Sequence, residues 1–347
     1  MIASPSLIRP PGLRPGDTLG VVSPSYAPRA SSLANGVRAL ERAGYNVVLA
    51  PEVTAHRRFT RAEDERRAAI FTELWTDPRV DGVIASTGGY GAVRIIPYLD
   101  PAVFRAHPKP FVGYSDITAL HSWFMRCCGL RTFHGPTVDD LNPDADPETV
   151  AALLAAITNP RPDAQLGRGT AKPVRQGRAV GPLVGGNLSL VEQTIGTPYE
   201  IDTRGAILFL EETRDPMSYV DERLVHLRNA GLLRGVRGVV LGQLSLDRSE
   251  EDEFEDFLLD LVSDLDVPVI TDFPAGHEMP NIALPFGTPV ELVAAGDAAW
   301  LNYADDALAP HGRAAVAAPE RPFAHQRLPD AGELAGDMAR DMAGFRN

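Results

Sequence analysis

Cysteine is scarce in this sequence: the chain of 347 residues has only two, Cys127 and Cys128, and they are neighbours. Adjacent cysteines are poorly placed to bridge one another, which excludes a disulfide framework and a zinc site built on thiolates. The chain also has no His-Glu-x-x-His motif of the kind that supplies zinc ligands. We therefore expect no metal centre, and we place both cysteines as small apolar residues on the helix predicted after Ser115.

Long apolar runs and basic clusters are missing as well. No segment approaches the ~20 apolar residues of a membrane span, and prolines interrupt residues 1–20, where a signal peptide needs an unbroken apolar segment. The 33 Lys and Arg residues are outnumbered by 46 Asp and Glu, so the net charge is -13 and the counterion-release energy of nucleic-acid binding is absent. The sequence predicts a cytoplasmic protein with no nucleic-acid or membrane partner.

Short β-branched runs alternate with longer amphipathic segments from Thr18 onward. Leu33, Val37 and Leu40 share one face of the first such segment, and a second helix is predicted over residues 61–76. Strands that alternate with helices predict a doubly wound parallel α/β sheet. Strands covered on both faces should be continuously apolar, as are the four predicted strands in TLGVVS, NVVLA, GVIAS and PFVGY.

Polar or glycine-rich loops follow three of these strands. They are SPSY at residues 23–26, STGGYG at 86–91 and GYSD at 113–116. In a doubly wound sheet, ligands bind beyond the carboxyl ends of the strands. The three loops therefore predict a site at that edge of the sheet.

The second half of the chain has a more mixed pattern. A helix predicted over 147–157 is followed by residues 161–178, which are rich in Pro, Gly and basic residues and lack periodicity, as linkers do. Strands and helices then resume and end in a predicted hairpin around a Gly-Asp turn. We predict an N-terminal α/β domain over 1–160, a smaller mixed α/β domain over 179–304 and a loosely ordered tail over 305–347.

The loop STGGYGAVR occupies the setting of a dinucleotide-binding fingerprint but fails its spacing. When the motif is read from Gly89, Arg94 stands where the third glycine is required. A nicotinamide cofactor is therefore not expected. Gly88 and Gly89 still leave backbone N–H groups able to point at an anion or a developing oxyanion. The alternative is a plain strand-to-helix turn.

Ser115, in PFVGYSDITALH, stands where a buried strand becomes a helix, so it is either a nucleophile or an ordinary helix N-cap. A serine nucleophile needs a base to take its proton and an acid to orient that base. His277, in a glycine-flanked loop after an apolar run, is the best-placed base, and His134 is the second choice. The acid is Glu211 or Glu212, which directly follow an apolar strand.

Strand geometry separates the two glutamates. Successive side chains of an extended strand point to opposite faces, so at most one of Glu211 and Glu212 can point toward His277. If the other carboxylate faces only solvent or a surface partner, its replacement by Gln should leave turnover near that of the wild type.

A series of segments, compatible in spacing along the chain, resembles the serine LD-carboxypeptidases, a group that includes the microcin C self-immunity peptidases. The segments are STGGYGAVRIIPYLD, GYSDITALH, FHGP, VGGNLSLV, GTPYE, ILFLEE, YVDERLVHLRNAGLL, GVVLGQL and GHEMPNIALPFG. The resemblance runs from about Leu13 to Val293. It implies an N-terminal flavodoxin-like sheet joined to a smaller α/β domain, with the site in the cleft between them and a homodimer as the assembly.

The resemblance also implies roles for single residues. Ser115 falls on the nucleophile, His277 on the base and Glu211 on the acid that orients it. The backbone amides of Asp116 and Gly89 fall on the oxyanion hole. The reaction implied is cleavage of the L,D-amide bond before the terminal D-alanine of murein tetrapeptide, in cell-wall recycling, with no cofactor.

Substrate recognition is less sharply defined by the sequence. Gly88 is a predicted substrate-binding residue, and Arg94 or Arg223 could hold the substrate's free carboxylate with a bidentate guanidinium. Thr87 stands before the paired glycines, where many murein-recycling members carry Arg, which favours the microcin branch. EETRDPMSYVDERL looks more like the murein branch.

Two alternative functions stay open. The first keeps the same triad and hydrolyses a microcin-like peptidyl nucleotide. The second, from another class, is a catalytically silent ligand-binding protein in the same cleft, or a nucleotide-dependent enzyme built on the glycine loop.

Overall fold

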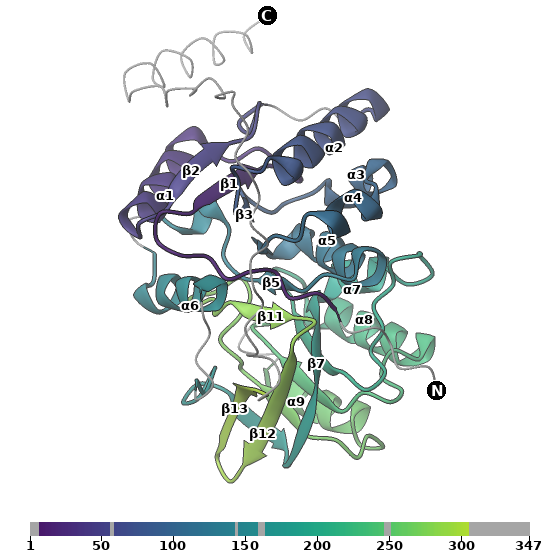
Figure 1. Cartoon of the computed structure of the whole chain (residues 1–347). Helices are drawn as coiled ribbons and strands as arrows, with labels where there is room; N and C mark the ends of the chain where they lie inside the picture. The colour runs from purple at the N-terminus through teal and green to yellow at the C-terminus, as the bar shows by residue number, and fades with distance from the viewer. Residues whose placement is uncertain (1–6, 56–58, 143–144, 159–163, 246–250, 305–347) are drawn as a thin grey trace, which may run out of the picture.

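The structure is a computed structural model, and it describes residues 7–55, 59–142, 145–158, 164–245 and 251–304 (Figure 1). These residues form two β-sheets with helices packed around them. The predicted tail lies outside the described residues.

The first sheet has the strand order β11-β5-β4-β3-β1-β2. Strands β1 to β5 run parallel to their neighbours, and β11 runs antiparallel to β5. Without β11 the order is 2-1-3-4-5, the flavodoxin-like doubly wound arrangement, so the predicted fold class is confirmed. The strands are β1 (Thr18–Val22), β2 (Asn46–Leu49), β3 (Gly82–Ala85), β4 (Phe111–Gly113), β5 (Thr132–His134) and β11 (Leu284–Phe286).

Helices cover both faces of this sheet because successive strand residues point to opposite sides. In β3, Val83 and Ala85 pack into one apolar core with α2, while Ile84 packs into another core with α1 and α6. Figure 1 shows α2 to α5 on one side of the sheet and α1 and α6 on the other. The helices are α1 (Ala30–Arg42), α2 (Arg61–Thr76), α3 (Ala92–Ile95), α4 (Pro101–Ala106), α5 (Thr118–Trp123) and α6 (Pro147–Thr158).

The second sheet has the strand order β13-β12-β7-β8-β9-β10-β6. Strands β7 to β10 are parallel, whereas β6, β12 and β13 pair antiparallel with their neighbours, so the sheet is mixed, as predicted. Its strands are β6 (Lys172–Arg175), β7 (Gly177–Asn187), β8 (Ile207–Glu211), β9 (Gly238–Leu241), β10 (Val269–Thr271), β12 (Pro289–Ala295) and β13 (Ala298–Tyr303). Its helices are α7 (Leu188–Gln193), α8 (Met217–Ala230) and α9 (Glu251–Leu261).

Two strands depart from the division that the sequence predicts. Strand β6 lies inside the range predicted as a linker and pairs with β10 of the second sheet. Strand β11 comes from the second half but pairs with β5 of the first sheet. The chain therefore crosses back to the first sheet before it closes with the β12–β13 hairpin, and the domain boundaries above stay a prediction.

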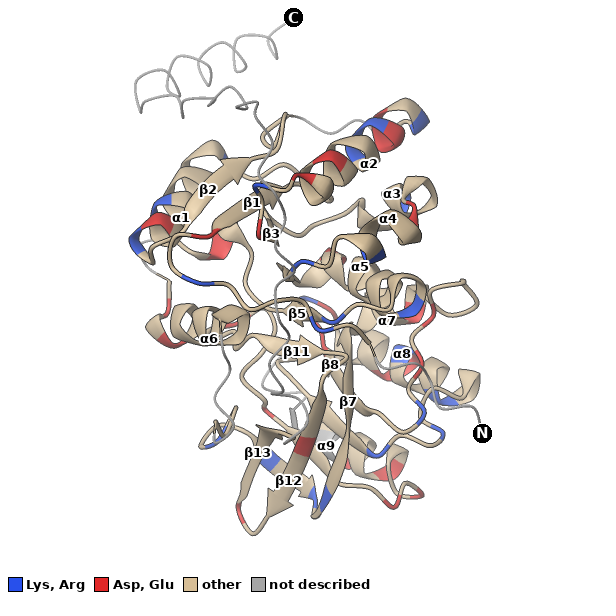
Figure 2. Cartoon of the chain, in the orientation of Figure 1, with Lys and Arg blue, Asp and Glu red and all other residues tan. Residues whose placement is uncertain are grey.

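Positively and negatively charged residues are interspersed along the helices and loops of both halves in the view of Figure 2. Within the described part of the chain, no helix has the length and apolar character needed to cross a membrane.

Candidate active site

Ser115 lies at a sharp turn between β4 and the helix that follows. Its φ of 61° is in the left-handed region, which non-glycine residues rarely adopt. The turn is tight, because a Cβ placed on Gly113 would lie 2.9 Å from the Ile117 side chain. Tyr114, not Ser115, is the N-cap of the short 3-10 turn at Ser115–Ile117. A half-buried serine with a strained backbone at a strand end has the geometry of a nucleophile elbow.

The structure brings Ser115, His277 and Glu211 together from three distant parts of the sequence. Nε2 of His277 lies 3.0 Å from the Ser115 hydroxyl oxygen, and Nδ1 lies 2.7 Å from a carboxylate oxygen of Glu211. With Glu211 ionised, Nδ1–H donates to the carboxylate, which leaves Nε2 to accept from the serine. This arrangement has the connectivity of a Ser-His-acid triad.

Glu211 is positioned by the pairing of β7 with β8. It is the last residue of β8, is fully buried, and pairs in register with Asn187 at the end of β7. The backbone N–H of Asn187 donates to the hydroxyl of Thr118 at 3.0 Å. Thr118 begins α5, the helix that follows Ser115. This hydrogen bond joins the end of β7, beside Glu211, to the helix that follows the nucleophile.

His277 lies in the loop between β10 and β11, and neighbouring contacts fix that loop. The side chain of Gln243 accepts from the backbone N–H of Glu278 at 2.7 Å and donates to the carbonyl of Pro280 at 3.0 Å. The ring of Tyr114 lies 4.8 Å, centroid to centroid, from the imidazole. Two contacts therefore position the imidazole: the hydrogen bonds of Gln243 fix its loop, and the ring of Tyr114 packs against it.

Burial and the neighbouring carboxylates have opposite effects on the pKa of His277. Burial alone lowers the pKa of His277, but the hydrogen bond and the charge of Glu211, with Glu212 and Asp140 adding to them, raise that pKa above its ordinary value. Burial raises the pKa of Glu211, and the hydrogen bond from His277 lowers it; the net shift is upward. The imidazolium that forms when His277 takes a proton is thus stabilised by its carboxylate partner.

Glu212 does not face solvent, which corrects one expectation from the sequence. It is buried, and its carboxylate accepts from Asn187 Nδ2 at 2.9 Å, from the Ser189 backbone N–H at 2.9 Å and from the Thr213 backbone N–H at 3.0 Å. The Ser189 hydroxyl also donates to it. Strand β8 ends at Glu211, and the two carboxylates have different partners: Glu211 pairs with His277, whereas Glu212 joins the end of β8 to the start of α7.

The hydrogen bonds of Glu212 were not predicted. Asn187 and Ser189 both occur in the VGGNLSLV motif, and Asn187 caps α7 by accepting from the backbone N–H of Leu190. An Asn at a strand-to-helix junction was the signal available in the sequence. Its partner lies 25 residues away in the chain, which local patterns cannot reveal.

His134, the second choice as base, serves another purpose. It is fully buried in β5, and neither ring nitrogen has a hydrogen-bond partner within the described residues. Burial, with smaller contributions from His121 and His277, places its pKa well below the ordinary value. Its ring packs against those of Phe209 and Phe286, so it is a neutral core residue.

Asp116 and Gly89, the two predicted oxyanion-hole residues, lie on loops that adjoin the nucleophile. The Asp116 carboxylate accepts from the Ser25 hydroxyl at 2.5 Å and from the Ala92 backbone N–H at 2.8 Å, so it joins three strand-end loops. Gly89 has a φ of 108°. Its neighbour Gly88 lies against the serine, because a Cβ there would be 3.0 Å from Cβ of Ser115. Their backbone role in catalysis stays a prediction.

The two candidate anchors for a substrate carboxylate already have acidic partners. Arg94 donates to Asp64 at 2.6 Å, and Arg223 donates to Asp215 at 2.6 Å. A substrate carboxylate would have to share either guanidinium with these groups. Their role as anchors stays a prediction.

The family assignment follows from comparison with known proteins. Residues 19–135 match the LD-carboxypeptidase N-terminal domain, and residues 180–292 match the LD-carboxypeptidase C-terminal domain. A protein of Bacillus subtilis (strain 168) named "Probable murein peptide carboxypeptidase" is 33% identical over 290 residues, which cover 82% of this chain and 91% of that protein. The chain belongs to the LD-carboxypeptidase family.

Both branches of this LD-carboxypeptidase family occur among the relatives. The crystal structure of muramoyltetrapeptide carboxypeptidase from Oxalobacter formigenes is 29% identical with a TM-score of 0.75, and the match covers 83% of this chain and 99% of that one. The microcin C7 self-immunity protein MccF of Escherichia coli is 26% identical over 329 residues, covering 84% of this chain and 94% of that protein. Carboxypeptidase activity is the chemistry that the family name carries.

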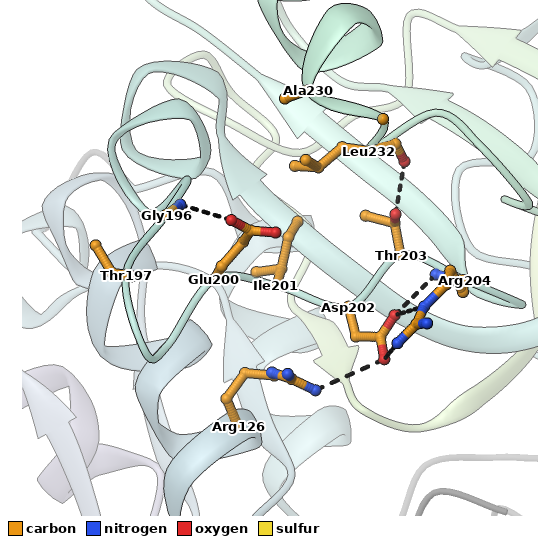
Figure 3. A pocket seen from close by; sticks show the side chains of 11 residues that line it. Arg126, Gly196, Thr197, Glu200, Ile201, Asp202, Thr203, Arg204, Ala230 and Leu232 are labelled. Carbon is orange, nitrogen blue, oxygen red and sulfur yellow. Dashed lines mark hydrogen bonds and ion pairs between the residues drawn. The ribbon is translucent and has the colours of Figure 1, made fainter.

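A separate cavity of about 340 Å³ lies apart from the triad in this LD-carboxypeptidase (Figure 3). Asp202 at its wall pairs with Arg204 at 2.9 Å and with Arg126 at 3.6 Å, and Glu200 accepts from the backbone N–H of Gly196 at 2.6 Å. Arg126 belongs to the first half of the chain, so this ion pair joins the halves.

Within the described residues, no cluster of three or more His, Cys, Asp or Glu side chains is arranged to hold a metal ion.

Proposed function

We propose that this chain is a serine carboxypeptidase that hydrolyses the L,D-amide bond before the terminal D-alanine of murein tetrapeptide. The observation that carries the proposal is the hydrogen-bonded chain from Ser115 through His277 to Glu211, at 3.0 and 2.7 Å. The names of the Bacillus subtilis and Oxalobacter formigenes relatives support the substrate class. A cytoplasmic location and a homodimer, expected from the sequence and the resemblance, belong to the same proposal.

The reaction proceeds through an acyl-enzyme. Oγ of Ser115 attacks the carbonyl carbon while Nε2 of His277 takes the hydroxyl proton. The backbone N–H groups of Asp116 and Gly89 stabilise the oxyanion of the tetrahedral intermediate. When the C–N bond breaks, His277 gives its proton to the leaving amine of D-alanine. Water then attacks the ester carbonyl while His277 takes a proton from it. The ester C–O bond breaks, and His277 returns the proton to Oγ of Ser115, which frees the tripeptide.

Mass spectrometry of the products tests this proposal. The protein is incubated with murein tetrapeptide and, separately, with a microcin-like peptidyl nucleotide. We expect the tetrapeptide to yield the tripeptide and free D-alanine. The proposal is wrong if the tetrapeptide stays intact under conditions in which the triad serine reacts with a serine-directed reagent.

The second candidate function is cleavage of a microcin-like peptidyl nucleotide by the same triad. Thr87 before the paired glycines and the similarity to MccF favour it. Cleavage of the nucleotide analogue with no release of D-alanine from the tetrapeptide is the result that would select this function.

The dependence of activity on pH follows from the raised pKa of His277. The base must be neutral to take the serine proton, so kcat/KM should fall as the pH drops through this pKa, with a midpoint above the ordinary 6.5. Glu211→Gln removes the carboxylate that raises the pKa, so it should shift the midpoint to lower pH. A midpoint that does not move in the variant would contradict the pairing.

Replacing Glu212 with Gln should destabilise the protein. A glutamine offers one acceptor oxygen in place of two and directs an NH2 group at donors, so part of the buried network loses its partners, at a cost of about 1–3 kcal/mol. Turnover should fall, but less than in Glu211→Gln. Denaturant unfolding and kcat measure the two effects, with the exposed Glu222→Gln on α8 as control. Stability and turnover equal to the control would show that the network is dispensable.

A further inference from the structure

Three aromatic rings form an exposed cluster outside the triad. Tyr26, Phe59 and Tyr90 are 47%, 42% and 43% exposed. The ring centroids of Tyr26 and Phe59 are 6.1 Å apart, and those of Phe59 and Tyr90 are 5.1 Å apart. We call these three rings the aromatic platform. Contiguous exposed apolar surface is unfavourable in water, and such patches mark ligand-binding or protein-interaction sites.

The platform gathers around the glycine loop that follows β3. Tyr90 belongs to this loop, Tyr26 follows β1, and Phe59 directly precedes the N-cap of α2. A Cβ placed on Gly91 would lie 3.6 Å from the Phe59 ring, so this ring packs beside the loop. The three rings therefore lie around residues 88–91, which follow the strand next to β4 and Ser115.

The near end of the platform adjoins the nucleophile through the glycine loop. The backbone N–H of Tyr26 donates to the carbonyl of Gly88 at 3.3 Å. A Cβ placed on Gly89 would lie 2.2 Å from the Tyr26 ring, so the ring packs directly on the glycine backbone. Gly88 in turn lies against Ser115. A ligand bound at Ser115 can thus continue onto the rings without a gap.

A buried ion-pair network holds the rings in place. Asp64 accepts from Arg94 at 2.6 Å and from Arg67 at 2.8 Å, and the side chains of Arg67 and Asp64 are only 2% and 5% exposed. Arg67 donates to the carbonyl of Pro24 at 2.6 Å, which fixes the loop of Tyr26. The guanidinium of Arg94 lies 5.8 Å from the centre of the Phe59 ring. The network therefore fixes the loop of Tyr26 and places a guanidinium beside the Phe59 ring.

The platform begins beside the nucleophile, so a substrate that continues beyond the tetrapeptide could reach it. After the terminal residue leaves, three residues of a tetrapeptide remain on the serine, and they extend about 10 Å. In a muramoyl peptide the next group is a sugar, whose C–H face stacks on aromatic rings. We propose, on the basis of the proposed function, that the aromatic platform binds the muramoyl sugar and gives the enzyme a preference for sugar-bearing peptides.

Paired substrates test the platform. The ratio of kcat/KM for muramoyltetrapeptide to that for free tetrapeptide is measured in the wild type, in Phe59→Leu and in Tyr90→Leu. We expect the ratio to exceed one in the wild type and to fall about fivefold in either variant, the size of one lost aromatic contact. Tyr98→Leu, which removes an exposed ring outside the platform, is the control and should keep the wild-type ratio.

Calorimetric binding to Ser115→Ala separates this inference from the proposed function, because binding needs no turnover. Tighter binding of muramoyltetrapeptide than of tetrapeptide, lost on adding Phe59→Leu, supports the platform even if the wild type hydrolyses neither. Equal affinity for the two ligands overturns it. Two other results also overturn it: Phe59→Leu weakens only a peptidyl nucleotide, or sedimentation shows that Phe59→Leu converts a dimer to a monomer.

Discussion

Replacing Ser115 with alanine should abolish hydrolysis while the protein stays folded. The hydroxyl is the only group that the change removes, and its loss takes away the atom that forms the acyl-enzyme. Loss of the serine nucleophile in well-studied serine proteases costs about 10⁶-fold in kcat. Stability should change by less than about 1 kcal/mol, because alanine keeps Cβ and the same backbone constraint at a φ of 61°. The kcat for the tetrapeptide and denaturant unfolding measure these effects.

Ser31→Ala is the matched control for this change. Ser31 is an exposed serine of α1. The control variant should keep wild-type turnover. A Ser115→Ala variant with near wild-type turnover would show that the reaction does not use this serine and would end the serine-peptidase account.

Replacing Glu211 with Gln should give the second-largest loss. The neutral amide cannot stabilise the imidazolium, and its NH2 group can favour the tautomer in which Nδ1 accepts, which takes the acceptor away from Nε2. The equivalent change in Ser-His-Asp proteases lowers turnover by about 10⁴-fold. We expect a loss of up to that size in kcat. Because the Glu211 side chain is fully buried, the variant must also be checked for folding.

Comparison with Glu212→Gln makes the test of Glu211 specific. Both glutamates are buried, but His277 donates only to Glu211. The larger loss of turnover should therefore fall on Glu211→Gln, and the acid limb of the pH profile should shift further in that variant than in Glu212→Gln, because Glu211 raises the pKa of His277 more than Glu212 does. A larger loss in Glu212→Gln, with the larger shift of the pH profile, would mean that the orienting acid is misassigned by one residue.

Much of the first sheet could be predicted from the sequence because its strands are covered on both faces. TLGVVS and GVIAS are continuously apolar, and they form β1 and β3. The helix predicted over 61–76 is α2 with the same bounds. The hairpin around Gly296 and Asp297 is β12 and β13. In each case the signal is local, since period, apolar face and turn residues all lie within one segment.

Elements whose partners are distant in the sequence could not be predicted in the same way. Strand β6 contains Lys172 and Pro173 and is stabilised by pairing with β10, almost a hundred residues later, so its own composition indicates a linker. Strand β11 has three residues, and its partner β5 lies in the other half of the chain. Short strands of this kind depend on tertiary contacts rather than on local propensity.

The active site, like the fold, could be predicted only where the signal is local in the sequence. The polar loops after β1, β3 and β4 could be located at one edge because parallel strands align their carboxyl ends, and Ser115 followed from that rule. The left-handed backbone of Ser115 could not be predicted, since GYSD lacks the second glycine of the usual elbow motif. The burial of Glu212 could not be predicted either, because it depends on Asn187 and Ser189 at the end of another strand.

Trapping the acyl-enzyme tests the central claim most directly. The protein is mixed with murein tetrapeptide, quenched in acid and examined by intact-mass and peptide-mapping mass spectrometry. The account predicts an adduct with the mass of the acyl tripeptide, in ester linkage to Ser115, and no adduct in Ser115→Ala. Release of D-alanine with an adduct on another residue, or release that continues at the wild-type rate in Ser115→Ala, would contradict it.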